Sequence, residues 1–68
     1  MMRFGARIVL NEDLLLNGGM TKIPRGALGR ITRQARESGN KADGMLWGVT
    51  FDKGPEVWCA QFSLREAS

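Results

Sequence analysis

Short stretches of alternating apolar and polar residues run along the chain, and each ends at a cluster of glycine, proline, asparagine or aspartate. Residues 7–10, Arg-Ile-Val-Leu, are mostly β-branched or apolar and precede the turn-forming sequence Asn-Glu-Asp, so they predict a first strand. Residues 30–36 predict a second strand, with Ile31, Arg33 and Ala35 on one face and polar residues on the other.

A third strand is predicted over residues 45–52. Its alternation places Trp47, Val49 and Phe51 on one face. Gly48 stands in mid-strand, where glycine is typical of a bulge or of a close approach of another group to the backbone. The strand ends at the tight-turn sequence Asp-Lys-Gly.

The chain then continues into a fourth predicted strand over residues 56–62. Pro55 is tolerated at its start because the missing N–H lies outside the hydrogen-bond ladder. We expect residues 63–66 to form a terminal 3₁₀ turn or a one-turn helix, in which Leu64 closes one end of the fold. Residues 37–44 are polar and contain glycine, so we expect a mobile tip between the second and third strands.

Three consecutive leucines, Leu14, Leu15 and Leu16, follow the first strand in a connection that closes at Asn-Gly-Gly. A single helical turn and an irregular apolar flap both fit this stretch. Because three adjacent side chains cannot all face one side, some pack on the core and others are exposed. Exposed leucines would indicate an interface, and a satellite cluster beneath the loop is the alternative.

Four or five short strands without a long helix predict an all-β fold. The chain is too short for the two full sheets of a sandwich, so one sheet curled on itself, a small barrel, is expected as a single domain over residues 1–68. The expected core, which one tryptophan joins, consists of Ile8, Leu10, Ile23, Leu28, Ile31, Val49, Phe51, Val57, Phe62 and Leu64.

The residue types present exclude several kinds of chemistry. Cys59 is the only cysteine and there is no histidine, so neither a disulfide framework nor a zinc site is expected, and a nucleophile would lack a base. We therefore expect no catalytic residue, no metal and no cofactor. The chain has no apolar run of the length that a signal peptide or membrane span requires, so we expect a soluble protein in a reducing, cytoplasmic location.

The net charge of +3 is unevenly distributed. Residues 15–36 contain no acid, and their cations are Lys22, Arg25, Arg30, Arg33 and Arg36. This asymmetry predicts a positive patch on one strand and its entry loop, able to contact an anionic partner. The alternative is an ordinary solvated strand face, since edge strands carry cations that discourage pairing.

Four segments of the chain together resemble the SH3-like small barrels of bacteria, phages and plasmids. They are Phe-Gly-Ala-Arg-Ile-Val-Leu at residues 4–10, Ile-Pro-Arg-Gly-Ala-Leu-Gly-Arg-Ile at residues 23–31, Val-Thr-Phe-Asp-Lys-Gly at residues 49–54, and the late Leu64. The glycine pair before a strand is similar to KOW-type segments as well. The resemblance covers nearly the whole chain and implies a fold more than a function, because this barrel hosts many unrelated roles.

The chain is also similar in architecture to the plasmid-encoded type II dihydrofolate reductases, which are tetramers of SH3-like chains. Their active pore is lined by a Val-Gln-Ile-Tyr segment on a late strand. The corresponding place in this chain reads Val57-Trp58-Cys59-Ala60 and lacks the glutamine and the tyrosine. The similarity therefore implies the architecture and not the reductase activity.

Two functional hypotheses follow. The first is a non-catalytic, accessory or regulatory module that binds another protein through Leu14, Leu15, Leu16 and an exposed Trp58, with a homo-oligomer as one form of such binding. The second is RNA or DNA binding, in which Trp47 stacks on a base and five cations contact the phosphates. These cations are Lys22, Arg25, Arg30, Arg33 and Arg36.

Overall fold

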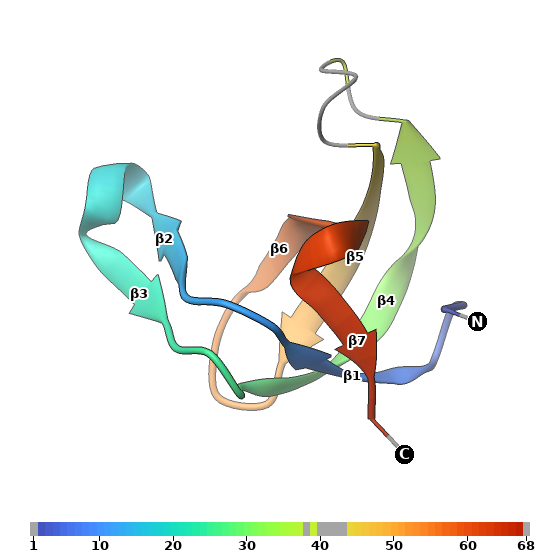
Figure 1. Ribbon diagram of the computed structural model, residues 1–68, viewed down its shortest axis with the longest axis horizontal. Coiled ribbons are helices and arrows are strands. Elements are labelled where there is room, and N and C mark those ends of the chain that lie inside the picture. Colours follow the sequence, from blue (N-terminus) through green and yellow to red (C-terminus); the bar gives the residue numbers. More distant parts are fainter. Residues whose placement is uncertain (1, 38, 40–43, 68) are drawn as a thin grey trace.

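The computed structural model describes residues 2–37, 39 and 44–67, which fold into strands and two 3₁₀ turns. One sheet has the strand order β6-β5-β4-β1-β7, and a separate hairpin pairs β2 with β3. The sheet strands are β1 (Arg7–Leu10), β4 (Leu28–Glu37), β5 (Met45–Phe51), β6 (Glu56–Ala60) and β7 (Leu64–Glu66). The hairpin consists of β2 (Leu14–Leu16), the 3₁₀ turn η1 (Asn17–Gly19) and β3 (Thr21–Ile23), and it projects from one side of the sheet (Figure 1).

The long strand β4 joins the two halves of the sheet. Its first residues pair with β1 in the register Arg7↔Arg30 and Val9↔Leu28, and β5 pairs along its length. The register with β5 shifts twice, once between Ile31 and Arg33 and again between Arg33 and Arg36. Such irregularities bend a strand and increase its twist, and β4 is visibly curved (Figure 1).

The core lies on the inner face of the curved sheet. Ile8, Leu10, Ile31, Val49 and Cys59 are its most deeply buried side chains and come from four strands. The hairpin adds Ile23, β5 adds Phe51 and β7 adds Leu64. Each fully buried aliphatic side chain contributes about 1.5–3 kcal/mol relative to an exposed one, so these few residues provide most of the stabilisation.

The predicted all-β fold, a small barrel with a terminal 3₁₀ turn, is confirmed. The strands predicted at residues 7–10 and 45–52 are present as β1 and β5, and the turn between β5 and β6 lies where Asp-Lys-Gly-Pro predicts it. The tip expected at residues 37–44 falls mostly outside the described residues.

The leucine run forms strand β2. The sequence analysis expected a helical turn or an irregular flap here, and both expectations are wrong. Leu14 pairs with Ile23 and Leu16 with Thr21. The connecting turn places Asn17, Gly18 and Gly19 at φ values of 54°, 68° and 92°. Asparagine and glycine adopt this left-handed region at the lowest steric cost, so Asn-Gly-Gly favours a hairpin.

The end of the chain also differs from the prediction. The fourth strand stops at Ala60, and the 3₁₀ turn η3 occupies Gln61–Ser63 instead of residues 63–66. Leu64 is buried as expected, but it begins β7 and pairs with Leu10. Because Phe62 lies in the turn it is 62% exposed, and Leu28 is 45% exposed at the start of β4, so the prediction that both belong to the core is wrong.

Replacing Gly29 with alanine should destabilise the barrel, because a Cβ atom there would lie 2.9 Å from the backbone oxygen of Thr50. We expect a loss of about 1–3 kcal/mol in the free energy of unfolding, measured by urea denaturation. Gly54→Ala is the control, since its Cβ would meet only Phe51 Cβ, at 3.5 Å. Equal stabilities of the two variants would contradict this packing.

Candidate functional site

Three arginines share the outer face of the sheet because of the bulges in β4. Arg30 pairs with Thr50, Arg33 with Gly48, and Arg36 with Leu46. Those β5 residues alternate along their strand and so point to one face, and directly paired residues lie on the same face. The strict alternation assumed from the sequence, which placed Arg33 opposite Arg30 and Arg36, is therefore wrong.

Trp58 lies on this same outer face. It pairs with Gly48 across the sheet and is 38% exposed. The guanidinium carbon of Arg36 lies 4.2 Å from the centroid of its ring, which is a cation–π contact. Arg36 thus reaches from β4 across β5 to β6 and covers one face of the indole.

Gly48 makes room for this arrangement. A Cβ atom at this position would lie 2.4 Å from Arg33 Cβ and 2.8 Å from Arg33 Cγ. The side-chain stem of Arg33 therefore lies over the glycine backbone and buries it. This is the close approach that a mid-strand glycine predicts.

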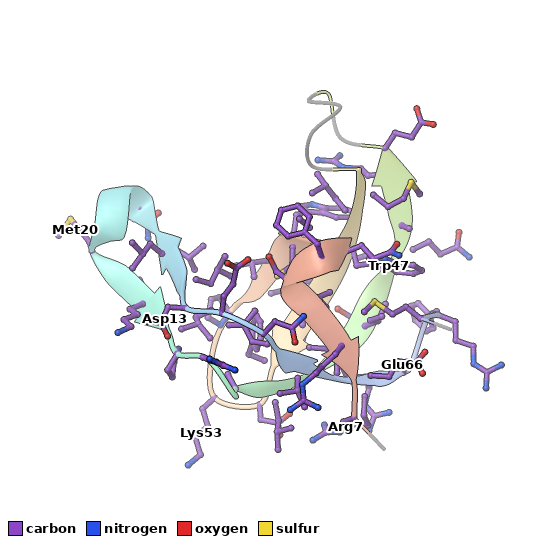
Figure 2. The ribbon with its side chains drawn as sticks, in the orientation of Figure 1. Arg7, Asp13, Met20, Trp47, Lys53 and Glu66 are labelled. Carbon is purple, nitrogen blue, oxygen red and sulfur yellow. The ribbon has the colours of Figure 1, made fainter. Side chains whose placement is uncertain are left out.

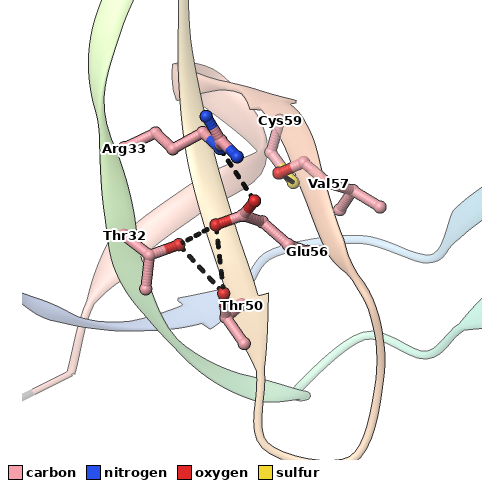
Figure 3. A network of polar contacts seen from close by, with 6 residues as sticks. All are labelled: Thr32, Arg33, Thr50, Glu56, Val57 and Cys59. Carbon is pink, nitrogen blue, oxygen red and sulfur yellow. Dashed lines mark hydrogen bonds and ion pairs between the residues drawn. The ribbon is translucent and has the colours of Figure 1, made fainter.

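Glu56 holds the polar end of the outer face together (Figure 3). Its carboxylate accepts hydrogen bonds from Thr32 Oγ1 and from Arg33 Nε, both at 2.7 Å, and Thr50 Oγ1 lies 3.5 Å away. The hydroxyls of Thr32 and Thr50 are 2.9 Å apart. The hydrogen bond from Thr32, followed by that from Arg33, lowers the pKa of Glu56. Its charge in turn fixes the guanidinium of Arg33.

The other predicted cations do not extend this surface into one patch. Arg30 donates a 2.8 Å hydrogen bond to the carbonyl of Gly5. Lys22 lies on the hairpin, where its Nζ is 3.3 Å from Asp13 Oδ2. Arg25 lies in the turn before β4, and its backbone N–H bonds to the same carboxylate at 2.8 Å. The structure brings together Arg30, Arg33 and Arg36, and leaves the other two cations apart.

Trp47, the second tryptophan, occupies the opposite face of the sheet. It pairs with Cys59, packs against the core and is half-buried. Its indole N–H donates to Gln61 Oε1 at 3.1 Å, which ties β5 to the turn η3. Trp58 is therefore the more exposed tryptophan, and Trp47 is the one that joins the core.

The leucines of the hairpin divide between core and solvent. Leu14 and Leu16 are half-buried and pack against the core, whereas Leu15 between them is 62% exposed. Met20, which the sequence analysis did not single out, is 89% exposed at the far end of the hairpin (Figure 2). Residues 14–21 carry no charge. The hairpin thus presents an apolar, uncharged tip to solvent.

Cys59 is buried in the core. Burial raises the pKa of its thiol to about 11, so the reactive thiolate is scarce at neutral pH. Within the described part of the chain, no three histidine, cysteine, aspartate or glutamate residues lie close enough to hold a metal ion. No helix among the described residues has the length and apolar character needed to cross a membrane.

Comparison with known proteins assigns no family to this geometry, because no family model, no curated protein and no solved structure matches the chain.

Glu56→Gln should reduce the loss of stability that the protein shows in acid. A carboxylate whose pKa is lowered by folding stabilises the protein above its unfolded pKa, and this stabilisation disappears as the pH falls through the folded value. Urea unfolding measured at neutral pH and below the ordinary glutamate value of 4.5 should therefore show a shallower pH dependence for the variant. An unchanged slope would contradict the role assigned to Glu56.

Proposed function

We propose that the chain is a non-catalytic binding module of the SH3-like kind that holds another protein through the β2–β3 hairpin. The exposure of Leu15 and Met20 on a projecting hairpin whose residues 14–21 carry no charge carries this proposal. Large apolar side chains that a small domain exposes together on one projecting element are typical of interaction sites. Catalysis by Cys59 is disfavoured, because the thiol is buried and the chain contains no histidine to activate it.

The hairpin also has the form that a partner can stabilise. It is a separate two-stranded sheet, and such hairpins are at best marginally stable in water unless something packs against them. Leu14 and Leu16 fasten one face to the barrel, while Leu15 on the other face remains available. A partner that covers Leu15 and Met20 would remove apolar surface from water, and the neighbouring Lys22, which lies opposite Leu15, is already paired with Asp13. We therefore expect binding that depends little on salt.

A second candidate is the binding of single-stranded nucleic acid on the outer face of the sheet. The gathering of Arg30, Arg33 and Arg36 beside Trp58 favours it, since cations and an aromatic ring are the usual elements of such sites. It ranks second because Arg33 is already paired with Glu56 and Arg30 with the carbonyl of Gly5. Moving Arg33 onto a phosphate would leave the Glu56 charge without its partner.

Leu15→Asp should abolish partner binding, because it places a charge in the proposed contact. The immobilised chain is exposed to a lysate of the cell that encodes it, and retained proteins are quantified by mass spectrometry. We expect retention of a true partner to fall at least about tenfold. Phe4→Asp is the matched control, since Phe4 is 63% exposed and Leu15 62%. Equal retention by wild type and Leu15→Asp would contradict the proposal.

The second candidate makes a different prediction. A labelled single-stranded RNA oligonucleotide should bind at low salt with an affinity that falls at least about tenfold at high salt. Arg36→Ala should weaken this binding more than Arg65→Ala, a control at an exposed residue of β7. Fluorescence anisotropy measures both effects. Absence of binding at low salt would eliminate this candidate and leave the protein-binding proposal intact.

A further inference from the structure

An apolar groove lies beside the base of the hairpin. It encloses about 440 Å³, and its apolar walls are formed by Ile23 and Pro24 at the end of β3, by Ala27 and Leu28 before and at the start of β4, and by Phe51. The side chain of Leu28 is 45% exposed at this groove. The groove is thus open to solvent and lined by the residues that connect the hairpin to the barrel.

Three charged residues also line the groove, and two of them are neutralised within the chain. Lys22 is paired with Asp13, and Asp52 accepts two 3.1 Å hydrogen bonds from the guanidinium of Arg7. Lys53 points away from the barrel into solvent (Figure 2). A charged occupant would gain little from these groups and would lose its hydration, so the groove is best suited to an uncharged, apolar segment.

The tip of the hairpin has this chemistry. Its residues 14–21 are uncharged, and Leu15 and Met20 are its exposed apolar side chains. The tip cannot fill its own groove, because β3 leads from the tip to the groove wall. Four residues of extended chain separate Met20 from Pro24, a distance of about 13 Å. Met20 can therefore reach only the groove of another molecule.

We propose that the partner of this hairpin is a second copy of the chain, with the tip of each copy seated in the groove of the other. This inference rests on the proposed function and names its partner. When the tip of each copy occupies the groove of the other, the two contacts are identical and form a closed two-fold dimer. No tip or groove is then left unoccupied. Met20 precedes β3 and the groove extends from its end, so a second copy placed alongside this strand meets both.

The surface area of the chain is consistent with such a dimer. The exposed area is 4699 Å² for a chain of 7.5 kDa, whereas a compact monomer of that mass exposes about 4,200 Å². If docking removes an area of this order from each copy, the interface totals about 1,000 Å², the size of weak and transient assemblies. The dimer should therefore depend on protein concentration.

The contact we propose is made by side chains and not by strand pairing. β3 is an edge strand of the hairpin and carries Lys22 at its centre. In an antiparallel pairing of two β3 strands about this residue, the two Lys22 side chains would face each other. Lysines at such positions discourage edge-to-edge pairing. Insertion of Leu15 and Met20 into the groove needs no pairing of the two β3 edges, and the Lys22 beside Leu15 in each copy is paired with Asp13 of its own chain.

Sedimentation equilibrium of the purified chain tests the proposal with two variants. Leu15→Asp places a charge on the tip, and Leu28→Lys places one in the groove. Each variant alone should dimerise at least about tenfold more weakly than wild type. An equal mixture should recover the dimer, because one contact is then unaltered and the other pairs aspartate with lysine. Phe4→Asp should behave as wild type, and circular dichroism verifies that every variant is folded.

The outcomes separate this inference from the proposed function. A wild-type chain that stays monomeric at high-micromolar concentration overturns the second-copy inference, and the lysate experiment then still decides whether the hairpin holds a different protein. A dimer that neither variant weakens, or that the mixture does not recover, places the contact elsewhere and also overturns it. Weakening by both variants with recovery in the mixture supports it.

Discussion

The structure depends on the curvature of β4. One ten-residue strand must pair with β1 at its start and with β5 along its length, while its apolar side chains remain on the inside of the barrel. Two register shifts allow this bend. Ile31, completely buried in the first half of β4, lies opposite Val49 and connects the two halves of the core. Without the bend, β1 with β7 and β5 with β6 could not enclose the same apolar residues.

The same bend determines what the surface can do. Each register shift reverses the face of the sheet to which the following side chains point. Arg30, Arg33 and Arg36 therefore lie on one face, together with Trp58. The short chain also has more apolar residues than its small core can enclose. Leu15 and Met20 remain outside on the hairpin and Phe62 on η3. The two candidate surfaces thus originate in the limited size of the core and in the irregularity of one strand.

Local sequence patterns predict the regular parts of this fold. β1 and β5 follow from alternation and from their turn residues, and the burial of Ile8, Val49 and Leu64 follows from the same patterns. Three leucines in a row carry no alternation, so β2 was not evident, although Asn-Gly-Gly is a hairpin signal that could have revealed it.

The candidate site is less predictable because it depends on pairing between distant segments. The positions of the shifts in β4 are set by packing against β5, so the common face of Arg33 and Arg36 cannot be read from period-two alternation. The contact of Arg36 with Trp58 spans three strands. That some leucines are exposed follows from the sequence, since adjacent leucines must diverge, but the position of Leu15 on the same hairpin as Met20 depends on strand pairing.

The most direct test of the account is a dilution series followed by backbone amide resonances in NMR spectra. If the hairpin is the binding element and a second copy its partner, the resonances of residues 14–21 and 26–28 should shift together with concentration, while those of Arg36 and Trp58 stay constant. Shifts confined to the outer face of β4, β5 and β6, or none at any concentration, would contradict it.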